Sequence, residues 1–117
     1  MAIPSGSGTE VLNRKHKRSL GASSYHTILT GEANHIYTIL SLHCMEASGA
    51  AGTIRIWLRN GSASEDVPLV QAQNIGNEET FVWNDKIVLV GTDQLKIWCS
   101  TSLSHWWVSY IEQDFGA

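Results

Sequence analysis

The sequence predicts an all-β domain, an antiparallel β-sandwich of six to eight strands preceded by an extended N-terminal arm. From residue 25 onward apolar and polar residues alternate with a period of two, which places successive side chains on opposite faces of a strand. Turn residues interrupt the alternation about every 8–12 residues, a spacing typical of sandwiches and barrels. No segment keeps a helical period over three turns. We therefore divide the chain into an arm, residues 1–24, and a β-sandwich domain, residues 25–117.

The arm is expected to be extended. Ile3 precedes a proline, whose ring disfavours helical conformations of the residue before it. Residues 9–18 hold too few apolar side chains for a stable isolated helix. The arm therefore lacks a core of its own, and we expect it to leave its domain and become ordered against a neighbouring subunit or another protein.

Three strands are predicted in the first half of the domain. Residues 36–45 are rich in β-branched and aromatic residues, which favour strands. Residues 53–59 alternate cleanly and are followed at once by Asn60-Gly61, a strong turn signal. Residues 67–72 indicate a third strand, which Pro68 confines to a sheet edge or a strand start.

Four more strands are predicted in the second half, over residues 79–83, 86–90, 94–100 and 105–112. Short turns rich in Gly, Asn and Asp separate the first three of them. Within residues 94–100 the alternation places Leu95, Ile97 and Cys99 inward. Lys96 and Trp98 then face outward.

Composition indicates a small interaction domain. The chain has 117 residues, enough for one domain, and only 16% of them are charged. Five residues are tryptophan, which is enriched at protein interfaces. No apolar run is long enough for a membrane span and no signal core is present, so we expect a protein made in a cytoplasm, not secreted and without a membrane partner. Cys44 and Cys99 are expected to be buried free thiols.

The charges are distributed unevenly along the chain. Residues 1–18 hold four bases and one acid, a net charge of +3, whereas residues 19–117 hold four bases and ten acids, a net charge of −6. The basic arm therefore suits an acidic protein surface or a neighbouring copy of the acidic domain. Nucleic acid is not an expected partner, because the arm has no aromatic residue and the domain is acidic. The candidate contact residues of the arm are Ile3, Val11, Leu12, Arg14, Lys15, Lys17 and Arg18.

No motif points to catalysis, a metal or a cofactor. None of the five histidines forms a His-x-x-x-His pair or joins a Cys-x-x-Cys pair. There is no Gly-x-Ser-x-Gly elbow and no phosphate-binding loop. The acid pairs Glu65-Asp66 and Glu78-Glu79 point to opposite faces of an extended chain and cannot converge on a substrate. We therefore predict that the protein is not an enzyme.

The tryptophans are the remaining candidates. Trp57 and Trp98 alternate with basic residues on the outward side of their strands. They either cover the second face of the sandwich or form an exposed patch that meets another subunit or a sugar ring. The candidate aromatic contacts are Trp57, Trp98, Trp106 and Trp107.

Two segments resemble small structural proteins of tailed bacteriophages. One is the opening AIPSGSGTEVL, residues 2–12. The other is residues 80–97, an apolar strand, an Asn-Asp-Lys turn, a second strand, a Gly-x-Asp turn and a third strand, followed later by VSYIEQ, residues 108–113. The resemblance implies a virion protein, foremost a capsid decoration (cement) protein that binds and stabilises the assembled shell through its arm and Trp-rich faces. A tail, neck or fibre component is the alternative, and a carbohydrate-binding module is a further one.

The expected partners follow from both lines of reasoning. Low charge density and Trp-rich strand faces favour a homo-oligomer. The resemblance alone favours a trimer over a dimer, and it implies the major capsid protein or another virion protein as the second partner. It also implies location in the virion.

Overall fold

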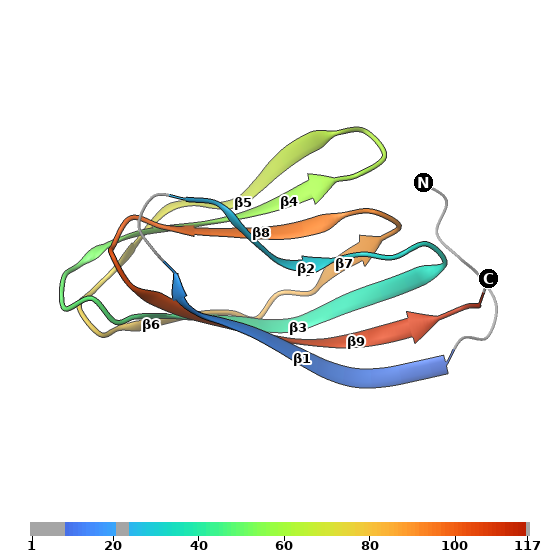
Figure 1. Ribbon diagram of the computed structural model, residues 1–117, viewed down its shortest axis with the longest axis horizontal. Coiled ribbons are helices and arrows are strands. Elements are labelled where there is room, and N and C mark those ends of the chain that lie inside the picture. The colour runs from blue at the N-terminus through green and yellow to red at the C-terminus, as the bar shows by residue number, and fades with distance from the viewer. Residues whose placement is uncertain (1–8, 21–23, 117) are drawn as a thin grey trace.

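The computed structural model describes residues 9–20 and 24–116, and these form nine β-strands. In chain order they are β1 (Thr9–Leu20), β2 (His26–Thr30), β3 (His35–Glu46), β4 (Gly52–Asn60), β5 (Glu65–Ile75), β6 (Thr80–Trp83), β7 (Ile87–Val90), β8 (Gln94–Cys99) and β9 (Ser104–Asp114). Two antiparallel sheets pack face to face (Figure 1), which confirms the predicted β-sandwich. The number of strands exceeds the expected six to eight because β1 and the short β2 add to the predicted set.

The two sheets differ in their edges. Sheet A has the order β1-β9-β3, and β6 and β7 pair with successive parts of the far side of β3. Sheet B has the order β2-β8-β4-β5. Pro68 lies in β5, an edge strand, as its missing amide hydrogen requires. Strand β1 is the outer edge of sheet A and has 12 residues.

The core lies between the sheets and consists of the inward residues of each strand. Completely or almost completely buried side chains include Ile39, Leu42, Val108 and Tyr110 of sheet A and Ile54, Ile56, Leu95 and Ile97 of sheet B. Both cysteines are buried free thiols, as expected. Burial raises the pKa of the Cys44 thiol, which therefore stays protonated and unreactive at neutral pH.

Asp93 joins three loops at one end of the sandwich. Its carboxylate accepts the amide hydrogens of Gly61, at 3.0 Å, and Val90, at 3.1 Å, and its carbonyl accepts the amide hydrogen of Gly31 at 2.7 Å. A Cβ atom at Gly61 would collide with the backbone of Thr92. The glycine after Asn60 thus serves this close approach between loops, at the place where a turn is predicted.

Glu46 joins two loops at the other end. Its buried carboxylate accepts hydrogen bonds from the hydroxyl and amide of Ser48, and from the amide of Glu78 at 3.0 Å. The hydrogen bond from the Ser48 side chain is the main reason that the pKa of Glu46 falls to about 2, although burial acts in the opposite direction. The ionised carboxylate therefore holds the loop after β3 against the loop before β6.

The basic segment expected to be a detached arm is, over residues 9–20, part of its own sheet. Strand β1 pairs antiparallel with β9, from Thr9 opposite Asp114 to Lys17 opposite Trp106. The prediction that this segment leaves its domain is therefore wrong for these residues. Without β1, strand β9 would leave a row of unpaired amide and carbonyl groups, and the extended chain satisfies them. Ile3 lies outside the described residues.

Candidate interaction surfaces

The outward faces of the two sheets carry most of the candidate residues. Among residues 9–20 and 24–116, no group of three or more His, Cys, Asp and Glu side chains is placed to hold a metal ion. The same residues include no helix that is both long and apolar enough to cross a membrane.

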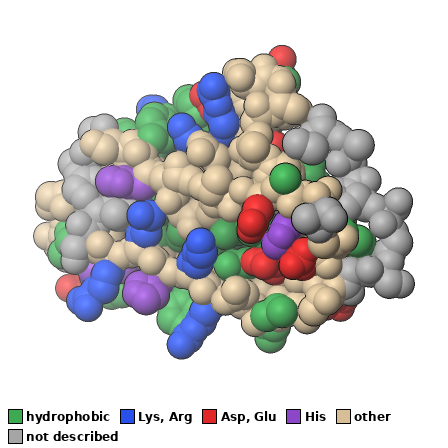
Figure 2. All heavy atoms as spheres, turned by 45° about the vertical axis from the view of Figure 1, so that its right-hand side comes forward, with side chains coloured by type: hydrophobic (Ala, Val, Ile, Leu, Met, Phe, Trp, Pro, Cys, Tyr) green, Lys and Arg blue, Asp and Glu red, His purple; other side chains and the backbone are tan. Residues whose placement is uncertain are grey.

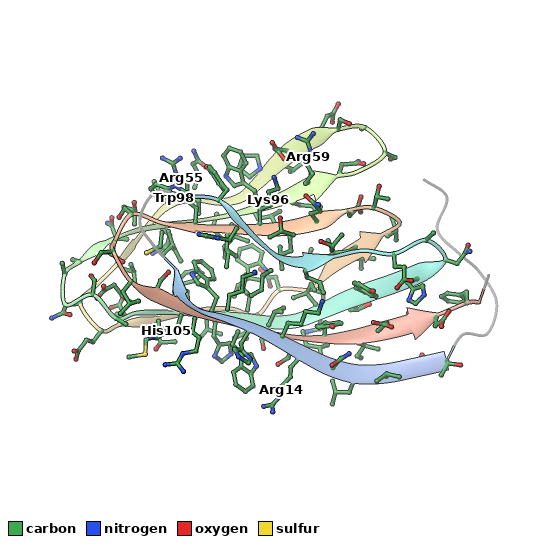
Figure 3. All side chains as sticks on the ribbon, in the orientation of Figure 1. Arg14, Arg55, Arg59, Lys96, Trp98 and His105 are labelled. Atoms are coloured by element: carbon green, nitrogen blue, oxygen red, sulfur yellow. The ribbon has the colours of Figure 1, made fainter. Side chains whose placement is uncertain are left out.

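We call the outward side of β4 and β8, together with Tyr25, the B face. Arg55 lies opposite Trp98 across the two strands, and Trp57 lies opposite Lys96. Figure 3 shows Arg55, Lys96 and Trp98 on the side of sheet B that faces away from sheet A. The alternation predicted for these strands is correct, and both tryptophans are half-buried.

The two tryptophans of the B face contact side chains of their own chain. The guanidinium carbon of Arg55 lies 4.3 Å from the ring centroid of Trp98, and Arg55 also donates a hydrogen bond of 3.2 Å to the Tyr25 hydroxyl. The Tyr25 ring lies 4.7 Å from that of Trp57, whose indole N–H donates to Gln71 at 3.1 Å. This cluster ties the chain before β2 onto sheet B, and Tyr25 itself stays 40% exposed.

We call the outward side of sheet A the A face. Its central row crosses four strands, with Val82, His43, Trp107 and His16 directly opposite one another. Trp107 keeps 41% of its surface exposed. A second row ends on β1 at Leu12, which is 73% exposed. The large apolar side chains exposed on this face are Leu12, Met45, Val82, Val88 and Trp107.

Trp107 is held in place but not covered. The guanidinium carbon of Arg14 lies 4.8 Å from its ring centroid, a cation–π contact across β1 and β9. Its indole N–H donates to the Ser109 hydroxyl at 3.1 Å. Figure 3 shows Arg14 projecting from sheet A on the side away from sheet B. The ring therefore has a fixed orientation and an accessible surface, which suits it to a partner.

An open cavity of about 550 Å³ adjoins this row at the end of sheet A where β9 begins. We call it the basic cavity; its lining residues are His16, Lys17, Arg18, His43, Met45, Thr80, His105, Trp106 and Trp107. None of them is acidic. The histidines come from β1, β3 and β9, far apart in the sequence, so only the strand register brings them together and no sequence spacing could have indicated the site.

Trp106 does not belong to an exposed aromatic face, so that prediction is wrong. Its side chain is 2% exposed, and its indole N–H donates to the Ser104 hydroxyl at 2.9 Å. Adjacent strand residues point to opposite faces, and the outward position belongs to Trp107. For the same reason Lys15, opposite the inward residue Val108, lies on the other side of β1 from Arg14. Lys17, opposite the inward Trp106, lies where the register of β1 begins to shift and borders the basic cavity together with Trp106.

The opposite end of sheet A is acidic. His35 lies 3.4 Å from Asp114, 3.5 Å from Glu112 and 3.7 Å from Glu32. Figure 2 shows acidic side chains gathered around a histidine in this way. Burial, followed by the charges of Glu112 and Glu32, raises the pKa of Tyr37 nearby to about 12. We call the three carboxylates Glu32, Glu112 and Asp114 the acid end.

The comparisons with known proteins support the fold. No family model matches the chain, and the curated proteins give no match. A similar solved structure is a chain described under "Bacillus endospore appendages form a novel family of disulfide-linked pili". The two share 14% sequence identity with a TM-score of 0.60, over 99% of this chain and 97% of that chain. At this identity the likeness establishes a common fold over the whole domain.

Proposed function

We propose that the protein is a non-enzymatic structural subunit that assembles with copies of itself. The observation that carries the proposal is the A face, where exposed apolar side chains including Leu12 and Trp107 lie on or beside edge strand β1. The outer side of β1 pairs with no other strand among the described residues. Apolar side chains gathered on one surface gain free energy when a partner covers them. A free strand edge offers main-chain hydrogen bonds to the same partner. A second copy supplies both complements without any further component.

The similar pilus chain supports this proposal, because it has the same fold over its full length and belongs to a polymer. That polymer is described as disulfide-linked. In this chain Cys44 and Cys99 are both buried and free. Contacts between copies are therefore non-covalent, and a reducing agent leaves them intact.

The resemblance to tailed-phage virion proteins remains a prediction about where such a subunit would act. The strand and turn order of residues 80–97, which carries that resemblance, corresponds to β6, β7 and β8. In a virion the subunit would decorate the capsid, as a trimer or dimer, and bind the major capsid protein. The ratio of this protein to the major capsid protein in purified particles tests that setting.

Sedimentation velocity and electron microscopy of the purified protein test self-assembly. We expect the mean mass to rise with concentration, equally with and without dithiothreitol. Leu12→Ser, on the A face, should weaken assembly. Val67→Ser, which removes an exposed apolar side chain from edge strand β5 of the other sheet, is the control and should not. A monomer at every concentration would contradict the proposal.

A further inference from the structure

The basic cavity carries a concentrated positive charge beside apolar surface. Lys17 and Arg18 are cations at neutral pH. No carboxylate lies among the lining residues to offset them. A partner that fits this cavity therefore presents carboxylates, together with some apolar surface for Trp107.

The acid end of the same chain has the complementary charge. The side chains of Glu32 and Asp114 are 66% and 51% exposed, and Glu112 is 27% exposed. His35 lies within 3.7 Å of all three carboxylates, and a single imidazolium charge could offset only one of them. At neutral pH the acid end therefore keeps a net negative charge on accessible oxygens.

The acid end cannot reach the basic cavity of its own chain. Trp106 and Trp107 line the cavity near the start of β9, and Asp114 ends that strand. Eight strand residues separate Trp106 from Asp114, about 27 Å at the usual rise of an extended chain. Figure 1 shows β9 running along the long axis of the molecule, so the two surfaces lie toward opposite ends.

We propose that the acid end of one copy binds in the basic cavity of the next copy. This inference rests on the proposed function and specifies its contact. Two different surfaces meet, so a bound pair still presents one free cavity and one free acid end, and the same contact can repeat. The product is a head-to-tail row of subunits along the long axis.

Charged and apolar side chains contribute differently to this contact between copies. Single exposed ion pairs contribute little to affinity, so they select the partner surface and its orientation more than they hold it. Trp107 and Met45, each 41% exposed, supply the apolar area that closes over the contact. High salt should therefore slow assembly and weaken it only in part.

Charge reversal tests the contact directly. The cavity variant carries Lys17→Glu and Arg18→Glu, and the end variant carries Glu32→Lys and Asp114→Lys. We expect each variant alone to assemble at least tenfold more weakly than the unmodified protein in sedimentation velocity. The two variants mixed should assemble again as an alternating row, because the end of each variant is opposite in charge to the cavity of the other. A variant with all four changes should assemble again.

Controls separate this inference from the proposed function. Arg59→Glu with Lys96→Glu reverses two charges on the B face and should leave assembly unchanged. The milder variants Lys17→Gln/Arg18→Gln and Glu32→Gln/Asp114→Asn remove the charges without reversing them. Each should weaken assembly less than the corresponding charge-reversed variant, a graded response that loss through misfolding would not give. If the unmodified protein never assembles, the proposed function fails. If it assembles and the cavity and end variants assemble equally well, or the fourfold variant does not recover, only the head-to-tail contact is wrong.

Discussion

The two outward faces of the sandwich contain the same kinds of side chain and use them differently. On the B face the Trp98 ring lies under Arg55, and the Trp57 ring lies against Tyr25. On the A face Trp107 also has an arginine beside it, yet 41% of its surface stays open and further exposed apolar side chains surround it. The tryptophans of the B face thus pack against an arginine and a tyrosine of the same chain, whereas Trp107 stands among other exposed apolar side chains.

This difference separates tryptophans that stabilise a fold from tryptophans that are available to a partner. Trp57, Trp98 and Trp107 all occupy outward positions of central strands. They differ in the side chains that pack against their rings, such as Tyr25, from the segment that leads into β2, against Trp57. Mutations at equivalent outward positions should therefore affect stability on one face and assembly on the other.

The largest expected effect is on the B face. Trp57→Ala removes a half-buried ring together with its contact to Tyr25 and its hydrogen bond to Gln71. We expect the free energy of unfolding to fall by about 2–3 kcal/mol, less than the ~3–5 kcal/mol of a fully buried aromatic. Urea denaturation measures it. A loss within ~0.5 kcal/mol, the range of ordinary surface substitutions, would show that the B face is as incomplete as the A face.

The second effect, on the A face, is a loss of self-association with little loss of stability. Trp107→Ala should lower the free energy of unfolding by less than about 1 kcal/mol, because much of the ring is already in water. It should weaken self-association about tenfold or more, as expected for an aromatic residue central to an interface. Sedimentation velocity and urea denaturation of the same sample give both values. Equal losses of stability in Trp107→Ala and Trp57→Ala would remove the distinction between the faces.

Acid should affect the two faces unequally through Glu46. The pKa of Glu46 is lowered to about 2 in the folded protein, chiefly by the Ser48 side chain, from an ordinary value near 4.5. Its stabilising contribution is therefore complete above about pH 4.5 and is lost as the pH falls toward 2. Glu46 ends β3, one residue from Met45 at the basic cavity, whereas the ring contacts of the B face involve no carboxylate.

Amide hydrogen exchange of Ser48 and Glu78, followed from pH 5 downward in the folded protein, measures this effect after correction for intrinsic exchange. We expect protection of these amides to decline between about pH 4.5 and 2, before that of the strands on sheet B. Glu46→Gln should flatten the dependence and leave the amides less protected at pH 5. Parallel pH profiles for the two proteins would rule out this role of Glu46.

Most strands could be predicted from local pattern, and the pairing of strands could not. The strands over residues 36–45, 53–59 and 94–100 were each located to within about one residue, since alternation and turn residues mark them directly. Strand β1 has no buried side chain among residues 9–18, so nothing in its composition marks it as part of a sheet. Its place follows from the free edge of β9, a property of the assembled fold.

The basic cavity could not be predicted from the sequence either, because it too depends on how the strands pair. His16, His43 and Trp107 form one row only because β1, β9 and β3 pair in a particular register. Lys17 and Arg18 were already candidate contact residues through their charge, and the structure adds the surroundings in which they act. Trp106 and Trp107 show the limit most directly, because a shift of one residue in register would exchange their roles.

The smallest expected effect concerns the ion pair between Arg59 and Asp66 on the B face. Their charged atoms lie 3.1 Å apart across β4 and β5, and the side chains are 35% and 31% exposed. Water and salt screen such a pair, so the coupling from a double-mutant cycle of Arg59→Ala and Asp66→Ala should be about 0–1 kcal/mol. Neither change should alter assembly, since the pair is complete within one chain. A coupling well above this range, or a change in sedimentation, would mean that the B face also meets a partner and that the contrast between the faces is one of degree.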